Sequence, residues 1–235
     1  MAKQVVPEAA RRRRRPTRGG TVLSEEIIVQ TALRVLREHG STGLTARRLG
    51  MALGADPSTL YRYFAGMDEL ARAIGDELMG RALDGWAATG DWRTDLRALG
   101  QAIYASYLAH PQAAVLTASR VTGRPREIAV DEAILGILRD TGLPDPVAVR
   151  IYHTFIDQSL AFAALDAGAL ALADDARAGD EERWCTTYAQ LPAQSHPNIA
   201  ATAQLLARRM PHSAYPAALE MLLEHTAAQL TRIRP

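Results

Sequence analysis

The side chains best suited to chemistry in this sequence lie close together, at Ser58, Thr59, Tyr61 and Arg62. Two hydroxyls, a phenol and a guanidinium can hydrogen-bond to phosphate oxygens and to the edges of base pairs. Leu60 and Phe64 recur at an interval of four, so on a helix they would share a buried side and leave the polar groups pointing elsewhere. We therefore expect a helix that enters the major groove of DNA by its N-terminal end.

The sequence around these side chains predicts the two short helices needed to position them. One fits residues 45–53 and is stopped by Gly54. The next begins at Asp56, which can cap it, has Pro57 in its first turn and runs to about Phe64. The pair is typical of a helix-turn-helix. Spacing alone leaves an alternative open, an ordinary helical hairpin that does not bind DNA.

A longer amphipathic helix fits the segment from Ser24, a capping residue, to Gly40, and it completes a three-helix domain over residues 21–67. Residues 1–20 contain Arg11 to Arg15 and no apolar periodicity, which predicts a disordered basic arm. The arm either follows the minor groove or the phosphates of DNA, or serves as a solubilising tail. Both interpretations stay open.

The run Leu44-Thr45-Ala46-Arg47-Arg48-Leu49, then Leu53-Gly54-Ala55, Thr59-Leu60-Tyr61-Arg62-Tyr63-Phe64 and Asp68-Glu69-Leu70, resembles the DNA-binding domain of the tetracycline-repressor (TetR) family. The resemblance covers residues 24–75. It continues more weakly from Asp91 to about Leu143, where Trp92 and the segments 107–111 and 123–125 look like the ligand domain of the tetracycline repressor.

This resemblance implies a homodimer that binds a palindromic operator as a repressor and leaves it when a small molecule enters the larger domain. It also supplies the residues expected to contact DNA, which are Thr45, Arg47, Arg48, Ser58, Thr59, Tyr61, Arg62 and Tyr63. Two departures stand out. Met67 replaces a lysine that family members often use on a phosphate, and Asp56 and Pro57 replace small or polar contact residues, so the operator sequence does not follow.

Charge is distributed unevenly along the chain. Residues 1–75 carry 13 Lys and Arg against 7 Asp and Glu, whereas residues 76–235 carry 14 against 19. A basic first third joined to an acidic remainder is typical of a module for nucleic acid attached to a body with another role. The alternative is a local imbalance that only solvates a surface.

The rest of the chain is also helical in its periodicity, so the fold class is all-α. We expect helices near 93–109, 112–121, 125–141, 146–172, 198–210 and 214–231, following a long helix from Asp68 to about Trp86. Residues 173–197 are interrupted by three Asp, one Gly and two Pro residues and predict a flexible insertion with one helical turn around Trp184 to Ala189. Residues 68–235 would form a larger helical domain for ligand binding and dimerisation.

Two of these helices, 146–172 and 214–231, are apolar around most of their circumference. Such helices must be covered on both sides. One side can face the domain core and the other a second subunit, which predicts a four-helix dimer interface. The alternative is that both helices lie at the centre of a monomer.

A small-molecule site is expected among side chains on the larger domain's helices. The candidates are Trp86, Tyr104, Tyr107, Phe155, Gln158 and Phe162. Their aromatic character favours a largely apolar effector, although core packing could account for any one of them. Gln101, His153, Asp157 and Gln158 are possible polar contacts, although the spacing of His153 and Asp157 is also typical of a structural pair. Thr117 and Ala118 stand where the tetracycline repressor has its metal-binding histidine, so we expect no tetracycline–magnesium and no cofactor.

Other classes of protein fit poorly. One cysteine, Cys185, excludes a disulfide framework, and six scattered histidines predict no metal site. The N-terminal arginines are not followed by the apolar run of a signal peptide, and no uninterrupted membrane span is predicted, so we expect a cytoplasmic protein. An enzyme is disfavoured because no nucleophile–base pair or phosphate-binding loop is evident. A constitutive architectural DNA-binding protein would leave two thirds of the chain without a role.

Overall fold

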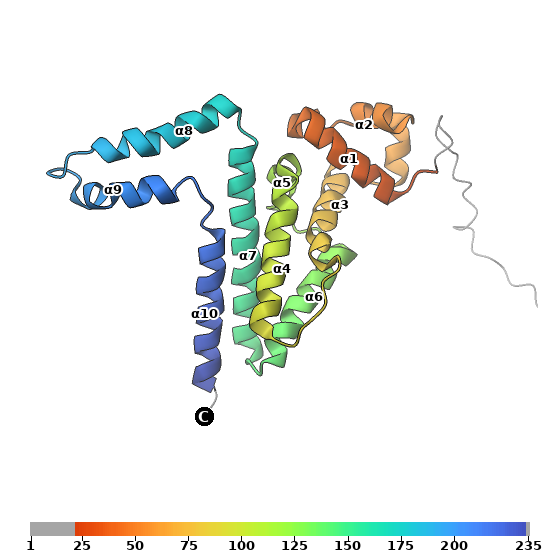
Figure 1. The fold of residues 1–235 in the computed structure, drawn as a ribbon. Helices are drawn as coiled ribbons and strands as arrows, with labels where there is room; N and C mark the ends of the chain where they lie inside the picture. Colours follow the sequence, from red (N-terminus) through yellow and green to blue (C-terminus); the bar gives the residue numbers. More distant parts are fainter. Residues whose placement is uncertain (1–21, 234–235) are drawn as a thin grey trace, which may run out of the picture. The chain divides into compact units, whose positions relative to one another are not determined.

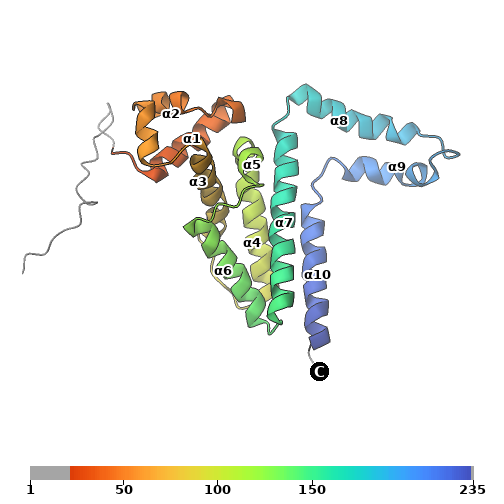
Figure 2. The same ribbon diagram turned by 180° about the vertical axis from the view of Figure 1, so that it is seen from behind.

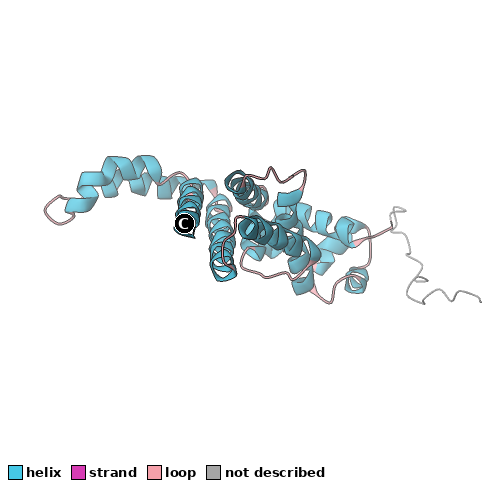
Figure 3. Cartoon of the chain, turned by 90° about the horizontal axis from the view of Figure 1, so that it is seen from below, coloured by secondary structure: helices cyan, strands magenta, loops and turns pink. Residues whose placement is uncertain are grey.

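The computed structural model of the chain describes residues 22–233, so the arm predicted over residues 1–20, with Arg11 to Arg15, lies outside the described part. The described residues form helices and no strand (Figure 3), which confirms the all-α prediction. Contacts divide the chain into two compact units, residues 1–70 and residues 71–235. Each is described separately below.

The first unit follows the predicted helices closely. It contains α1 (Glu25–His39), the 3₁₀ turn η2 (Ser41–Gly43), α2 (Ala46–Leu53), the 3₁₀ helix η3 (Pro57–Arg62) and the start of α3 (Met67–Gly80). The Ser24 hydroxyl accepts a hydrogen bond from the backbone N–H of Ile27 at 3.2 Å, and α1 ends at Gly40, where φ is +72°. Both ends of α1 therefore form as predicted, through local capping. The core of the unit is apolar, with Ile28, Ala32, Leu36, Leu49, Leu60 and Phe64 buried.

The second unit is built around α7. Its helices after α3 are η4 (Arg81–Leu83), α4 (Trp92–Leu108), α5 (Pro111–Thr117), α6 (Pro125–Asp140), α7 (Asp145–Leu170), α8 (Asp174–Thr186), η5 (Tyr188–Gln190), α9 (Pro197–Arg209) and α10 (Tyr215–Ile233). Helix α7 packs against α4, α5, α6 and α10, and it lies between α4 and α10 in Figures 1 and 2. A helix surrounded in this way needs apolar residues on several sides, as its sequence has.

The centre of this unit is a close packing of α4, α7 and α10 around Tyr215. A Cβ added to Gly100 of α4 would lie 2.7 Å from the Tyr215 hydroxyl and 3.1 Å from Cζ of Phe155. The Tyr215 ring stacks on Tyr104 with ring centroids 4.4 Å apart, and its hydroxyl is 2.9 Å from Oγ of Ser159. The absence of a side chain at Gly100 therefore allows two aromatic rings to approach the α4 backbone.

The prediction that residues 173–197 contain only one helical turn is wrong. Helix α8 occupies 13 residues there, and it lies beside η5 and α9 (Figure 1). Its sequence gives little sign of a helix because none of its residues is buried, so it lacks an apolar stripe. Its support is local, with acidic residues in its first turn and ion pairs three residues apart, at Arg177–Asp174 and Arg183–Asp180.

Two helix boundaries also differ from those expected. Helix α3 ends at Gly80 rather than near Trp86, and α5 ends at Thr117 rather than at residue 121.

Within residues 22–233, no single helix has the length and apolar character to cross a membrane. The segments Asp145–Leu170 and Asp174–Gln190 meet that criterion only as a pair, with a bend of 111° between them.

Candidate nucleic-acid interface and ligand pocket

The start of α2 presents polar side chains that its own fold holds in place. Thr45 is exposed and caps the helix, its Oγ1 accepting a hydrogen bond from the backbone N–H of Arg48 at 3.2 Å. A hydroxyl that accepts at a cap keeps its proton available for donation, for example to a phosphate. Arg47 is exposed, whereas the Arg48 guanidinium is half-buried and donates to the Gly43 carbonyl at 3.0 Å. Arg47 therefore faces solvent, and Arg48 braces the turn before the helix.

The turn between α2 and η3 is fixed by backbone geometry. Gly54 ends α2 in the left-handed region, with φ at +63°. The backbone N–H of Ala55 donates to the Gly50 carbonyl at 2.9 Å, and a Cβ on Gly50 would lie 3.0 Å from the carbonyl oxygen of Ala55. Asp56 then caps η3, with Oδ1 accepting from the backbone N–H of Ser58 at 2.8 Å, and its hydrogen bonds with Ser58 lower the pKa of Asp56. The sequence predicts this turn correctly.

The second helix of the motif differs from the expected one. It is a 3₁₀ helix over Pro57–Arg62, and it ends two residues before Phe64. In a 3₁₀ helix residues three apart are aligned. Leu60 and Tyr63 consequently share an inner row, and the Tyr63 hydroxyl donates to the Leu23 carbonyl at 2.9 Å. The structure thus gives Tyr63, which was expected to contact DNA, a hydrogen bond within the unit.

The remaining predicted contacts of η3 lie on its outer side. Ser58 and Tyr61 form an exposed row, and the Tyr61 side chain is 57% exposed. Thr59 is half-buried and Arg62 is exposed. An exposed row of hydroxyl, phenol and guanidinium groups, placed one tight turn after the exposed start of α2, can hydrogen-bond to phosphates and base edges.

The six residues expected to bind a ligand do not gather around one cavity. Tyr107 and Phe155 are almost completely buried in the core and line none of the described pockets. Phe162 tilts against Tyr215 with ring centroids 5.9 Å apart, and Tyr104 donates to Asp166 Oδ2 at 2.7 Å. These aromatic side chains pack around the centre of α4, α7 and α10.

The last two of the six have polar groups that the protein leaves unsatisfied. Trp86 is half-buried, and its indole N–H has no hydrogen-bond partner among the described residues. The same holds for the side-chain amide nitrogen of Gln158. Gln158 lines a pocket of about 420 Å³ between α7 and α10, together with Arg150, Ile151, Thr154, Ala218, Met221, Leu222 and His225.

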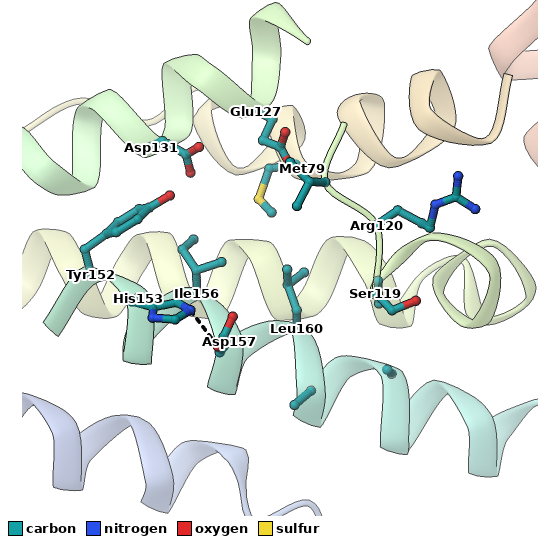
Figure 4. A pocket seen from close by; sticks show the side chains of 14 residues that line it. Met79, Ser119, Arg120, Glu127, Asp131, Tyr152, His153, Ile156, Asp157 and Leu160 are labelled. Carbon is teal, nitrogen blue, oxygen red and sulfur yellow. Dashed lines mark ion pairs between the residues drawn. The ribbon is translucent and has the colours of Figure 1, made fainter. Parts of the chain in front are cut away.

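A larger pocket of about 540 Å³ lies among α3, the end of α5, α6 and α7 (Figure 4), and His153 and Asp157 are the lining residues that were predicted as possible ligand contacts. Its apolar wall includes Met79, Ala118, Ile156, Leu160 and Ala164. Its polar groups are Ser119, Arg120, Glu127, Asp131, Tyr152, His153 and Asp157. Pockets with mostly apolar walls and a few convergent polar groups are typical small-molecule sites.

Two carboxylates on α6 give this pocket its polar character. Asp131 is half-buried, and Figure 4 shows the Tyr152 hydroxyl pointing toward its carboxylate; burial raises the pKa of both groups. Glu127 Oε2 accepts from Thr122 Oγ1 at 2.7 Å and from the backbone N–H of Gly123 at 2.7 Å. Glu127 therefore orders the segment after α5 that forms one edge of the pocket. In the sequence, the feature that could have indicated this site is the four-residue spacing of Glu127 and Asp131, beside the buried apolar residues of α6.

The predicted pair His153 and Asp157 does form, with Nε2 and Oδ2 3.1 Å apart, and both side chains are exposed at the rim of the same pocket. Helices α7 and α10 also keep large apolar side chains exposed, including Val149, Leu165 and Met221. Among residues 22–233, no group of three His, Cys, Asp or Glu side chains is arranged to hold a metal ion.

Comparison with known families covers nearly all of the described chain. Residues 28–74 match the family of bacterial regulatory proteins named tetR, and residues 86–230 match the family described as tetracyclin repressor-like, C-terminal domain. A curated relative, the HTH-type transcriptional repressor DrrR1 of Streptomyces coeruleorubidus, is 33% identical over 139 residues. That alignment covers 58% of this chain and 51% of DrrR1, so the chain spans about half the length of this relative.

Solved structures agree with these matches. A possible TetR family transcriptional regulator from Streptomyces coelicolor A3(2) is 27% identical, with a TM-score of 0.71 over 90% of this chain and 100% of its own. The structure of BioQ with its natural double-stranded DNA operator is 28% identical, with a TM-score of 0.55 over 63% of this chain and 88% of its own.

Proposed function

Because the chain belongs to the TetR family of bacterial regulatory proteins, we propose that it is a cytoplasmic transcriptional repressor that binds a palindromic operator as a homodimer and releases it on binding a small molecule. The observation that carries this proposal is the outer surface of the first unit. There the exposed start of α2 and the outer row of η3 present hydroxyl, phenol and guanidinium groups together.

The residues proposed to contact DNA are those whose hydrogen-bonding groups face solvent: Thr45, Arg47, Ser58, Thr59, Tyr61 and Arg62. Arg48 and Tyr63 would position these elements instead, since each donates a hydrogen bond to a backbone carbonyl of the same unit. The operator-bound structure of BioQ and the repressor DrrR1 support DNA binding by this kind of chain.

Dimerisation is proposed through α7 and α10. Their exposed Val149, Leu165 and Met221 are large apolar side chains that a second subunit would cover. An isologous interface would repeat the DNA-binding unit twice, and a two-fold symmetric protein reads a palindromic site in half-sites about one helical turn apart.

The ligand response is proposed to act through α3. This helix begins at Met67, directly after the helix-turn-helix, and its residue Met79 lines the large pocket. Asp76 of α3 also accepts a hydrogen bond at 2.8 Å from the backbone N–H of Glu127, another lining residue. A ligand that binds one position of α3 more tightly than another would change the population competent for DNA.

Selection of duplexes from a randomised pool, followed by fluorescence anisotropy with the full chain, tests the proposal. We expect the selected duplex to be palindromic and to bind at least about 10³ times more tightly than a scrambled duplex of equal length, with one dimer per site at saturation. Equal affinity for the two duplexes would indicate non-specific binding and contradict a repressor. Specific binding that no small molecule relieves would favour the constitutive DNA-binding alternative.

A further inference from the structure

The 540 Å³ pocket combines an apolar wall with an acidic end. Along α7, Tyr152, Ile156, Leu160 and Ala164 form one row at intervals of four, so a single side of the helix changes from polar to apolar. Figure 4 shows Asp131, Tyr152, His153 and Asp157 toward one end of the pocket with Ile156 among them, and Met79 and Leu160 farther along. A molecule that fills the space would meet carboxylates at one end and hydrocarbon along the rest.

The acidic end carries more negative than positive charge. Glu127, Asp131 and Asp157 line the pocket, whereas the one arginine, Arg120, lies at the opposite end in Figure 4. Glu127 is held in place by hydrogen bonds from the backbone N–H groups of Thr122 and Gly123 and from the Thr122 hydroxyl. Asp157 is paired with His153 at the exposed rim. The field at this end therefore favours a positive group.

Asp131 is the carboxylate best placed to receive such a group. It is half-buried, so a cation bound there is less screened by water than one at the rim. Figure 4 shows the Tyr152 hydroxyl pointing toward this carboxylate. A carboxylate offers about four acceptor positions, so Asp131 has capacity for a donor from a ligand. The Tyr152 oxygen can accept a bond from the same donor.

From this arrangement, and on the premise of the ligand-responsive function proposed above, we infer that the effector is an amphipathic organic cation. Its protonated nitrogen would bind Asp131 and the Tyr152 oxygen, and its apolar body would lie over Met79, Ile156 and Leu160. This proposal departs from the expectation of a largely apolar effector, because the structure packs Tyr107 and Phe155, two of the aromatic residues behind that expectation, in the core. The protein would then discriminate between small molecules by their positive charge rather than by their aromatic character.

Three fluorescent probes with one body and one tether length test this inference. They are dansylcadaverine, which is a cation at pH 7, its neutral N-acetyl derivative, and dansyl-6-aminohexanoate, which is an anion. Binding to the full chain without DNA is followed by the change in dansyl emission. We expect the cation to bind at least about tenfold more tightly than either other probe, as a hydrogen bond to a charged group implies.

Two variants test whether Asp131 causes the preference for the cationic probe. Asp131→Asn keeps the shape of the side chain and removes its charge. It should weaken binding of the cation by about tenfold or more and leave the affinity for the neutral probe unchanged. Glu132→Gln is the matched control, because it removes the same charge from the neighbouring exposed position, which does not line the pocket. This control should preserve the preference.

Equal affinity of the wild-type protein for all three probes would overturn the inference, as would tighter binding of the anion or no saturable binding of the cation. A preference that survives Asp131→Asn would also overturn it. The comparison of probes on the wild-type protein does not depend on any variant folding. Because DNA is absent, a protein that prefers the cation but binds no duplex specifically would contradict only the proposed function. A repressor without charge preference would contradict only this inference.

Discussion

Replacing Phe155 by Ala distinguishes a packing role for this residue from the ligand-binding role that its sequence position suggested. Its side chain is 1% exposed, and Cζ lies 3.1 Å from the position that a Cβ on Gly100 would occupy. Removing a ring packed this closely leaves a cavity that the neighbouring helix backbones cannot easily fill. Buried Phe→Ala substitutions cost about 3–5 kcal/mol, which is a large part of the roughly 5–15 kcal/mol that stabilises a typical protein.

Thermal and urea unfolding followed by circular dichroism measure this loss. For a unit of this size, about 3–5 kcal/mol corresponds to a fall in Tm of about 6–20 °C. Protein concentration must be fixed, because dimerisation would make the apparent stability depend on it. Ile128→Ala is the control. Ile128 is 56% exposed on α6 and lines none of the described pockets, so its loss should change the free energy of unfolding by no more than about 0.5 kcal/mol.

Probe binding completes the test. Well below its Tm, Phe155→Ala should still bind dansylcadaverine with nearly the affinity of the wild type, because Phe155 does not line the large pocket. A variant that unfolds within about 1 kcal/mol of the wild type and yet loses the probe would refute the reasoning. Phe155 would then be a ligand contact after all.

Three further predictions concern the turn, the surface and the assembly. Gly54→Ala, at φ +63°, should destabilise the first unit by about 1–2 kcal/mol in urea unfolding, whereas Gly66→Ala, which needs no left-handed backbone, should not. Hydrogen bonds from Arg97 lower the pKa of Glu220 to about 2, so the stability it contributes is present above pH 4.5 and is lost as the pH falls towards 2. The unfolding free energies of wild type and Glu220→Gln should differ by about 1 kcal/mol or less at pH 6 and converge by pH 2. Met221→Glu should convert a dimer into a monomer in sedimentation, and an unchanged dimer would exclude this face of α10 from the interface.

The elements predicted best are those that local chemistry specifies. Ser24 and Asp56 cap their helices, and Gly40 and Gly54 end theirs, because each effect depends on residues only a few positions apart. The 3₁₀ geometry of η3 was not predictable in the same way, since apolar residues four apart also fit an α-helix. A 3₁₀ helix turns about 20° more per residue than an α-helix does, and this difference turns Tyr63 inwards.

The ligand pocket was less accessible to sequence reasoning. Aromatic residues on α4 and α7 were predicted to be ligand contacts. In the structure, however, Phe155 packs in the core against Gly100 of α4. A pocket forms where small side chains such as Ala161 and Ala164 leave space, and empty space has no residue pattern of its own. Helix α8 shows a related limit, because a helix with no buried residue lacks the periodicity by which helices are predicted.

The central claim, that the outer row of η3 reads DNA, is tested most directly by the affinity of Tyr61→Ala for the selected duplex. Met51→Ala serves as the control, because Met51 is 67% exposed in the same unit and is not among the proposed contacts. We expect Tyr61→Ala to weaken binding by about 1–3 kcal/mol with unfolding unchanged, while Met51→Ala binds as the wild type does. Unaltered affinity of Tyr61→Ala, or an equal loss in both variants, would contradict the assignment of this surface.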